Sequence, residues 1–405
     1  MNDHLQTSVH KHYDVVIVGG GIMGASTAWF LSKDADFDGR VLVVERDPTY
    51  ETASTTHTNS CIRQQFSSAL NVKISQFAAD FVKNLRQYMG DDARVPPLSI
   101  QSFGYLYLAD TPGFADVLRE NQKVQLAAGA ATKLLTADEI LRDYPFYNVD
   151  DILLGSINLV DEGYWDGSTV FSWFRRQSRE AGIEYLHNEV MAIARNAAGT
   201  QVQSVTLKSG EVISCDKLVN ASGPRAVRTS QMLGIDIPVE PRKRYTWVFK
   251  ADKPLDRDLP LTIDPSGVHV REHGGGTYMA GGHADYDPAV DYTDFTMDHS
   301  LWEDHIWPVL ATRIPQFEAI KVQNEWAGHY AYNRLDQNAI IGPHPEVSNF
   351  YFLNGFSGHG LQQSPAMGRG LAELLVHGAY RTLDLTPFSF ERIAANRPIL
   401  EKAII

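Results

Sequence analysis

The sequence predicts a mixed α/β (α+β) protein, in which a parallel sheet with flanking helices is joined to a second, mainly antiparallel layer. The apolar run DVVIV at residues 14–18 is typical of a buried strand, and RVLVVE at residues 40–45 has the same character. Between them lie a glycine-rich turn and the stretch IMGASTAWFLSK, which predicts a helix. Strand, helix and strand in this order form a βαβ unit with parallel strands.

Later segments predict how the two layers are completed. KLVNASG at residues 217–223 and the apolar residues 350–353 indicate two more buried strands, each followed by a tight turn. Residues 236–290 alternate like antiparallel strands, with a hairpin turn at 274–276. Because strand and helix units occur near the start, middle and end of the chain, we expect one sheet built from distant segments. The segments between them would form the antiparallel layer.

Helices are expected at three further places. Apolar spacing predicts an amphipathic helix over residues 71–89 and another helix over residues 168–181. A last helix is expected to start at about Ser364, with Ser364 as N-cap and Pro365 at the first helical position. Gly378 would lie just beyond its end.

Composition and charge exclude several classes of function. The chain has 405 residues, of which 43% are hydrophobic and 21% charged, as in soluble globular proteins. The formal net charge of −13 argues against a nucleic-acid partner. Two cysteines, Cys61 and Cys215, are too few for a disulfide framework. With no signal peptide and no apolar run near about 18 residues, we expect a cytoplasmic protein without a transmembrane segment.

The first glycine-rich turn predicts a dinucleotide site. Gly19, Gly21 and Gly24 fit the pattern GxGxxG between a strand and a helix. The first glycine makes the tight turn, the second lets the backbone approach a pyrophosphate, and the third allows close helix packing. Glu45 ends the next strand, where a carboxylate accepts hydrogen bonds from ribose hydroxyls. An acid at this position favours FAD or NAD over NADP.

Two further glycine turns favour FAD over NAD. VNASG at residues 219–223 ends a strand, and NGFSGHGLQQSP at residues 354–365 lies between a strand and a helix. Close backbone approach at three separate points suits a long cofactor that lies across the sheet. The N-terminus of the last helix would stabilise negative charge on the pyrimidine end of a reduced flavin.

These residues resemble those of the D-amino-acid-oxidase-like family of FAD-dependent oxidoreductases, which includes sarcosine oxidase, glycine oxidase and dimethylglycine dehydrogenase. The resemblance extends over essentially the whole chain. The motifs that carry it are VVIVGGGIMG, LVVER, VNASGP, NAIIGP and GFSGHGLQQSP. In the branch of FAD-dependent oxidoreductase domain-containing proteins, IRQQF, DEG and GFSGHGLQQ also recur together, as they do here.

The resemblance implies two interleaved domains and a bound FAD. A Rossmann-type FAD-binding domain would comprise residues 1–90, 151–225 and 326–405, and an antiparallel-sheet substrate domain residues 91–150 and 226–325. The flavin is expected to be noncovalent, with a covalent bond to His57 as the alternative. The expected cofactor-binding residues are Gly19, Gly21, Ile22, Met23, Gly24, Glu45, Arg46, Ser54, Thr55, His57, Asn59, Ser60, Cys61, Val190, Ala221, Ser222, Gly223, His329, Gly355, Phe356, Gly358, His359, Gly360, Leu361 and Gln362.

Three residues receive specific roles from the resemblance. Arg63, in IRQQF, falls where sarcosine oxidases place an arginine for the substrate carboxylate, and a guanidinium grips a carboxylate with two hydrogen bonds. His57, in STTH, resembles the histidine that dimethylglycine dehydrogenases bond to the flavin. His329, shortly after WAG, is a second and weaker attachment candidate.

The chain also departs from the family pattern. Gln362 stands where the sarcosine oxidases have a lysine after GFSGHG, and Met279 would replace their oxygen-activating lysine. Reaction with oxygen is therefore expected to be slow, which favours a dehydrogenase with an electron carrier over an oxidase that uses O2.

The predicted reaction is oxidation of an amino acid C–N bond to an imine by hydride transfer to flavin N5, followed by hydrolysis. The substrate would be a secondary or N-methylated amino acid. Besides Arg63, the candidate catalytic residues are His283, Tyr330 and Tyr245. Two alternatives stay open: a flavin dehydrogenase of 2-hydroxy acids, which needs a base for the hydroxyl proton, and a non-catalytic flavoprotein assembly factor. No metal site is expected.

Overall fold

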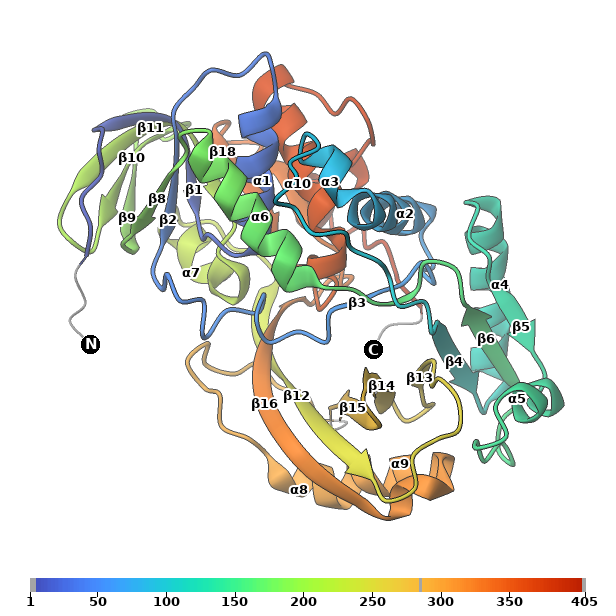
Figure 1. Cartoon of the computed structure of the whole chain (residues 1–405). Coiled ribbons are helices and arrows are strands. Elements are labelled where there is room, and N and C mark those ends of the chain that lie inside the picture. Colours follow the sequence, from blue (N-terminus) through green and yellow to red (C-terminus); the bar gives the residue numbers. More distant parts are fainter. Residues whose placement is uncertain (1–4, 284–285, 403–405) are drawn as a thin grey trace.

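A computed structural model describes residues 5–283 and 286–402, and two large sheets organise it (Figure 1). The first sheet has the strand order β17-β18-β11-β1-β2-β8, and β10 and β9 extend from β11. Its strands are β1 (His12–Val18), β2 (Val41–Glu45), β8 (Glu184–His187), β9 (Val190–Arg195), β10 (Val202–Leu207), β11 (Val212–Asn220), β17 (Ile340–Pro343) and β18 (Phe350–Asn354).

The centre of the first sheet is parallel, as predicted. β1 pairs in parallel with β2 and β11, while β8 and β18 continue the parallel arrangement on either side. Val15, Val16 and Ile17 are fully buried, because a parallel sheet of this kind is covered on both faces. β17 is antiparallel at one edge.

Helices α1 (Ile22–Lys33) and α10 (Gly360–His377) pack against each other beside this sheet, and α6 (Gly167–Glu180) also contacts α1 (Figure 1). A Cβ at Gly368 would stand 2.1 Å from Ser26 Oγ, so a glycine is needed for the two helices to approach this closely. Ser26 Oγ donates to Ser364 O at 2.7 Å. The remaining helices are α2 (Ala69–Lys83), α3 (Leu85–Tyr88), α4 (Pro112–Ala127), α5 (Ala137–Asp143), α7 (Ala226–Gln231), α8 (His299–Leu301), α9 (Trp307–Arg313) and α11 (Phe390–Ala394).

Two predicted helix boundaries are wrong. The last helix begins at Gly360 and not near Ser364, so Pro365 lies inside it. Proline is tolerated there because Leu361 O, which would have accepted from residue 365, accepts from Ser364 Oγ at 2.9 Å. The helix expected over residues 71–89 is divided into α2 and α3 at Asn84, whose backbone leaves the helical region.

The second sheet is mainly antiparallel, with the order β16-β12-β15-β14-β13-β4-β6-β5. Its strands are β4 (Tyr105–Ala109), β5 (Lys133–Leu135), β6 (Leu154–Asn158), β12 (Val239–Ala251), β13 (Leu261–Ile263), β14 (His269–Gly274), β15 (Thr277–Gly282) and β16 (Ile320–Asn333). A further two-residue pair joins β3 (Cys61–Ile62) to β7 (Gly163–Tyr164). The predicted hairpin turn at 274–276 connects β14 to β15. Only β13 and β4 pair in parallel among the described strands of this sheet.

The expected domain boundaries do not coincide with the two sheets. β6 lies within the expected FAD-binding segment 151–225 but pairs with β4 and β5 of the second sheet. The expected boundary at residue 326 divides β16, which pairs with β12 over its whole length. The ladder between β12 and β16 is continuous through residue 326, so no linker lies at that boundary. The division into domains stays a prediction.

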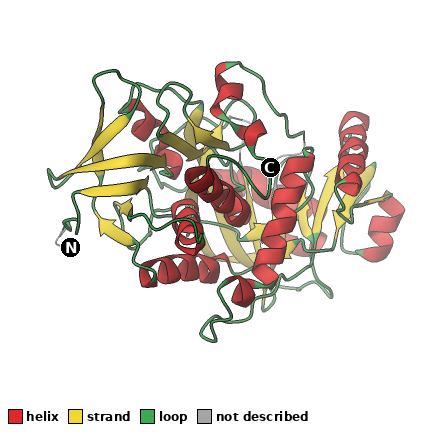
Figure 2. Cartoon of the chain, turned by 90° about the horizontal axis from the view of Figure 1, so that it is seen from above, coloured by secondary structure: helices red, strands yellow, loops and turns green. Residues whose placement is uncertain are grey.

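Helices and strands are distributed through the whole molecule (Figure 2). Among the described residues, no helix combines the length and the apolar character needed to cross a membrane.

Candidate cofactor and substrate site

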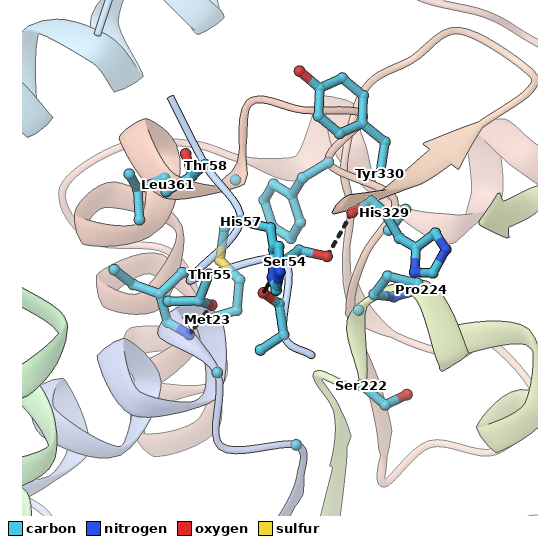
Figure 3. Close-up of a pocket in the computed structure, with 18 of the residues that line it drawn as sticks. Met23, Ser54, Thr55, His57, Thr58, Ser222, Pro224, His329, Tyr330 and Leu361 are labelled. Atoms are coloured by element: carbon cyan, nitrogen blue, oxygen red, sulfur yellow. Dashed lines mark hydrogen bonds between the residues drawn. The ribbon is translucent and has the colours of Figure 1, made fainter. Parts of the chain in front are cut away.

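A long cleft runs from the carboxyl ends of β1 and β2 to the second sheet. Its walls come from segments that are distant in sequence, because the parallel strands all end at the same edge of the sheet. Figure 3 shows side chains from α1 (Met23), from the loop after β2 (Ser54 and His57), from β16 (Tyr330) and from α10 (Leu361) around one space.

Two regions of the cleft differ in character. The β2 end is lined by Glu45, Arg46, Asp47, Asn188, Glu189, Arg225 and Arg228. The β12 end is lined by Cys61, Arg63, Tyr105, Arg244, Thr246, Leu261, His269 and Tyr330.

The glycine turn after β1 is shaped as the motif predicts. Gly19 has a φ of +99°, and a Cβ there would stand 2.5 Å from Ala221 O. A Cβ at Gly24 would stand 2.0 Å from Gly19 O, so Gly24 packs the helix against the turn and does not line the cleft. The helix N-terminus, with Gly21 as its N-cap, faces the cleft and favours a negatively charged group such as a phosphate.

Glu45 is fixed by the backbone around it. Its two oxygens accept hydrogen bonds from Gly20 N and Asp47 N, each at 2.8 Å. Burial raises the pKa of Glu45, and these hydrogen bonds partly offset the effect. Each carboxylate oxygen accepts more than one hydrogen bond, so Glu45 can still accept from a ribose hydroxyl.

The polar loop after β2 holds His57 close to His329. His57 Nδ1 lies 3.2 Å from Ala53 O; a carbonyl only accepts, so Nδ1 carries the proton and Nε2 keeps its lone pair. His329 Nε2 lies 2.8 Å from Asp294 O and is therefore the donor. Ser54 Oγ donates to His329 O at 2.6 Å, which joins the loop to β16 (Figure 3). Of the two expected attachment candidates, only His57 keeps a free Nε2.

Arg63 lies at the β12 end and is almost completely buried. One Nη donates to Gln65 O at 2.5 Å, the other lies 2.9 Å from His359 Nε2, and the guanidinium lies 4.1 Å from the Phe66 ring centre. Burial lowers the pKa of His359 to about 3, with a further contribution from Arg63, so this imidazole is neutral and accepts the hydrogen bond. The Arg63 backbone N–H donates to Gln362 Oε1 at 2.8 Å.

A buried carboxyl group behind Arg63 was not predicted as a site residue. Glu162 is fully buried and accepts from Gln64 N at 2.6 Å, from Gln65 Nε2 at 3.0 Å and from Asn158 Nδ2 at 2.9 Å. Burial raises the pKa of Glu162 to about 7, although these hydrogen bonds oppose the shift. Glu162 therefore fixes the segment that carries Arg63, and its charge is set by the pH.

Tyr330 packs between a glycine of the loop before α10 and an arginine of β12. A Cβ at Gly358 would stand 2.4 Å from Tyr330 Cε2, and the Arg244 guanidinium lies 5.0 Å from the centre of the Tyr330 ring. Burial raises the pKa of Tyr330, so its hydroxyl stays protonated at neutral pH.

Four predicted residues, Gly24 (described above), Tyr245, His283 and Gly355, lie differently from the expectation. The ring of Tyr245 packs 5.8 Å from that of Trp247, against the core cluster of the second sheet, although Tyr245 also contributes to the cleft lining. Successive residues of β12 face opposite sides of the sheet, so the side chain of Tyr245 points to the side opposite Arg244. His283 and Gly355 are not among the lining residues.

The cleft brings together most of the residues expected from the sequence. Those that line it are Gly19, Gly21, Ile22, Met23, Glu45, Arg46, Ser54, Thr55, His57, Asn59, Ser60, Cys61, Arg63, Val190, Ala221, Ser222, Gly223, Tyr245, His329, Tyr330, Phe356, Gly358, His359, Gly360, Leu361 and Gln362. Residues that were missed include Tyr105, Asn188, Glu189, Arg225, Arg228, Arg244, Thr246, His269 and Tyr292. A signal existed for Arg225 and Arg228, which closely follow the VNASG turn.

The comparisons with known proteins agree with this geometry. The family model "FAD dependent oxidoreductase" (DAO) matches residues 14–374. The chain belongs to this family. It is 38% identical to FAD-dependent oxidoreductase domain-containing protein 1 of Xenopus laevis, over 97% of this chain and 85% of that protein. It is 24% identical to the sarcosine oxidase subunit beta of Rhizobium meliloti, over 92% and 87% of the two chains.

A solved structure adds a match at the level of the fold. L-proline dehydrogenase from P. horikoshii superposes with a TM-score of 0.82 at 25% identity, covering 96% of this chain and 99% of that chain. The cofactor of this oxidoreductase is FAD. The residues present fit it, because the glycine turn leaves no room for side chains at Gly19 and Gly24 and the cleft continues from Glu45 to the second sheet.

Proposed function

We propose that this oxidoreductase oxidises the C–N bond of a secondary or N-methylated amino acid to an imine, which water hydrolyses. The observation that carries the proposal is the charge at the β12 end. Arg63 and Arg244 line this end, whereas the described carboxylates of the lining, Glu45, Asp47 and Glu189, belong to the β2 end. An enclosed cationic region binds an anionic group such as the carboxylate of an amino acid.

Arg63 and Tyr330 have defined parts in the proposal. Arg63 binds the substrate carboxylate with the N–H groups that Gln65 O and His359 leave unused. The protonated hydroxyl of Tyr330 donates a hydrogen bond to the substrate. Asp287 compensates the charge of Arg244, whereas Arg63 contacts no carboxylate of the described residues directly. Arg63 therefore disfavours a further positive charge nearby, so the substrate amine binds as the neutral base that oxidation requires. FAD, when bound, supplies the hydride acceptor.

The names of two relatives support a secondary amine. Sarcosine and proline, named in the Rhizobium meliloti protein and the P. horikoshii structure, are both secondary amino acids. A 2-hydroxy acid would use the same arginines but needs a base for its hydroxyl proton. Burial lowers the pKa of His269 to about 4, so this imidazole is a weak base. A weak base is poorly suited to remove the hydroxyl proton of a 2-hydroxy acid, whereas a neutral amine does not need to lose a proton.

An anaerobic titration of the FAD-loaded protein tests the proposal. N-methyl and cyclic secondary amino acids are added first, and 2-hydroxy acids second, while the flavin absorbance is followed. The proposal expects bleaching by at least one N-substituted amino acid. If only hydroxy acids bleach the flavin, the protein is a flavin dehydrogenase of 2-hydroxy acids and the proposal is refuted. If no compound reduces the flavin, the result favours a non-catalytic flavoprotein.

A further inference from the structure

One face of the second sheet closes the β12 end of the cleft and carries a row of polar side chains. Thr246 of β12 and His269 of β14 both pair with Gly281 of the strand between them, so the three residues lie side by side. Arg244 precedes Thr246 by two residues and faces the same side. Arg244, Thr246 and His269 all line the cleft.

Arg244 has an edge of its guanidinium without a partner. One Nη donates to Lys243 O at 2.8 Å and to Asp287 Oδ1 at 2.9 Å, and the other donates to Asp287 Oδ2 at 2.8 Å. Asp287 therefore occupies the edge formed by the two Nη atoms. Nε is buried and has no hydrogen-bond partner. A buried N–H without an acceptor is costly, so this atom needs a ligand.

His269 offers a second unpartnered donor in the same row. Its side chain is buried, with the residue 8% exposed, and Asn59 Nδ2 lies 3.1 Å from its Nε2. Asn59 Oδ1 accepts from Thr246 Oγ1 at 3.3 Å, which orients the amide so that Nδ2 donates to His269 Nε2. The proton of this neutral imidazole is then on Nδ1, which is buried and lies near Gly267 O without forming a hydrogen bond of good geometry. Both unpartnered atoms of the row are donors, and each needs an acceptor.

This row is separate from the place assigned to the first carboxylate. Arg63 bonds to His359, which follows Gly358 in the loop before α10. Tyr330 packs on Gly358, and Arg244 lies on the Tyr330 ring. Tyr330 thus contacts Arg244 directly, whereas Arg63 contacts the neighbouring loop through His359, so the two guanidinium groups are held by different parts of the cleft wall.

We propose that the substrate carries a second carboxylate, which is bound by Arg244 and His269, while Arg63 binds the carboxylate of the amino acid. The substrate class is then an N-substituted amino dicarboxylic acid. This inference rests on the proposed function, because Arg63 takes its role from there. It adds to that function that the substrate's side chain carries a carboxylate.

Binding of substrates that cannot be oxidised tests the inference separately from catalysis. The FAD-loaded protein is titrated with succinate, which has two carboxylates, and with butyrate, which has one, and the flavin spectrum reports binding. Succinate is expected to bind at least about tenfold more tightly than butyrate. Arg244→Met should remove this preference, and His269→Gln, a milder change, should reduce it.

Arg242→Met is the matched control. Arg242 also contacts Asp287, at 3.2 Å, and Glu240, but it does not line the cleft. The preference for succinate should survive in this variant. Equal affinities for succinate and butyrate in the wild type, or a preference that persists in both Arg244→Met and His269→Gln, would overturn the inference.

Flavin reduction distinguishes this inference from the proposed function. N-methylaspartate should reduce the flavin at lower concentrations than N-methylalanine. If N-methylalanine is as effective, the second carboxylate site is refuted while amino acid oxidation stands. If succinate is preferred but no amino acid reduces the flavin, the anion site is supported and the proposed reaction is refuted.

Discussion

The ring of Tyr330 lies directly on the backbone of Gly358, where a Cβ would stand 2.4 Å from the ring carbon Cε2. This contact joins the loop before α10 to β16 of the second sheet. It also places the Tyr330 hydroxyl at the β12 end of the cleft, where we propose that the substrate binds.

Replacing Gly358 tests this contact. Gly358→Ala should displace Tyr330 and weaken FAD binding at least about tenfold, because the methyl group has no space. Gly182→Ala is the control, since Gly182 has a similar φ of +93° against +89° for Gly358 but has no neighbour within 4 Å of its Cβ position. Gly182→Ala should cost only the backbone strain, about 1–2 kcal/mol. Equal FAD affinities for the two variants, measured by fluorescence titration, would contradict the account.

The buried Glu162 predicts a pH-dependent stability. Burial raises the pKa of Glu162 in the folded protein to about 7, above the 4.5 of an exposed glutamate. The folded state therefore retains the proton more strongly than the unfolded state, and stability should fall as the pH rises from about 4.5 through 7. This rise in the pKa corresponds to about 3 kcal/mol of stability.

Glu162→Gln removes the titrating group and should flatten this dependence. Denaturant unfolding of both proteins between pH 5 and pH 8 measures it, and the wild type should lose stability relative to the variant as the pH increases. Parallel curves for the two proteins would show that Glu162 does not titrate in this range.

The local motifs could be predicted because their contacts are between residues close together in the sequence. Gly19 and Gly24 make the turn and the helix contact within six residues, and spacing alone indicates both. The row formed by Arg244 and His269 depends on the register of β12, β15 and β14, which the sequence does not fix. Tyr245 was expected in the cleft and does line it, but the sequence did not indicate that its ring also packs against Trp247 and the core cluster of the second sheet.

Glu162 and Pro365 illustrate two other limits of the sequence. Glu162 belongs to the short segment DEG, and nothing local indicates that it accepts hydrogen bonds from residues about 100 positions away. Pro365 predicted a helix start, but the side chain of Ser364 replaces the missing backbone hydrogen bond and lets the helix begin five residues earlier.

The mode of flavin attachment is tested by acid precipitation of the yellow protein. We expect the FAD to remain in the supernatant, as a noncovalent cofactor does. If the flavin precipitates with the protein, we expect His57→Ala to release it and His329→Ala not to, because His57 lies in STTH, which resembles the attachment motif of dimethylglycine dehydrogenases. Release by His329→Ala alone would contradict this assignment.

Slow reaction with oxygen is a further prediction. Gln362 accepts from the Arg63 backbone N–H, and Met279 is a buried apolar residue of β15. Neither supplies the positive charge of the lysines that the resembling oxidases carry at the corresponding positions. Chemically reduced protein should therefore be reoxidised at least about tenfold more slowly by dissolved oxygen than by a soluble quinone. Stopped-flow absorbance measures both rates, and similar rates would identify an oxidase.

The most direct test of the central claim is the anaerobic reduction of the flavin by secondary amino acids, compared between the wild type and Arg63→Met. The account predicts bleaching of the wild type and at least about a hundredfold higher half-saturating concentration in the variant, because the carboxylate loses its guanidinium partner. Bound FAD is measured in both proteins, since Arg63 also contacts His359. Reduction that is unchanged in an FAD-loaded Arg63→Met variant, or its absence in the wild type, would contradict the account.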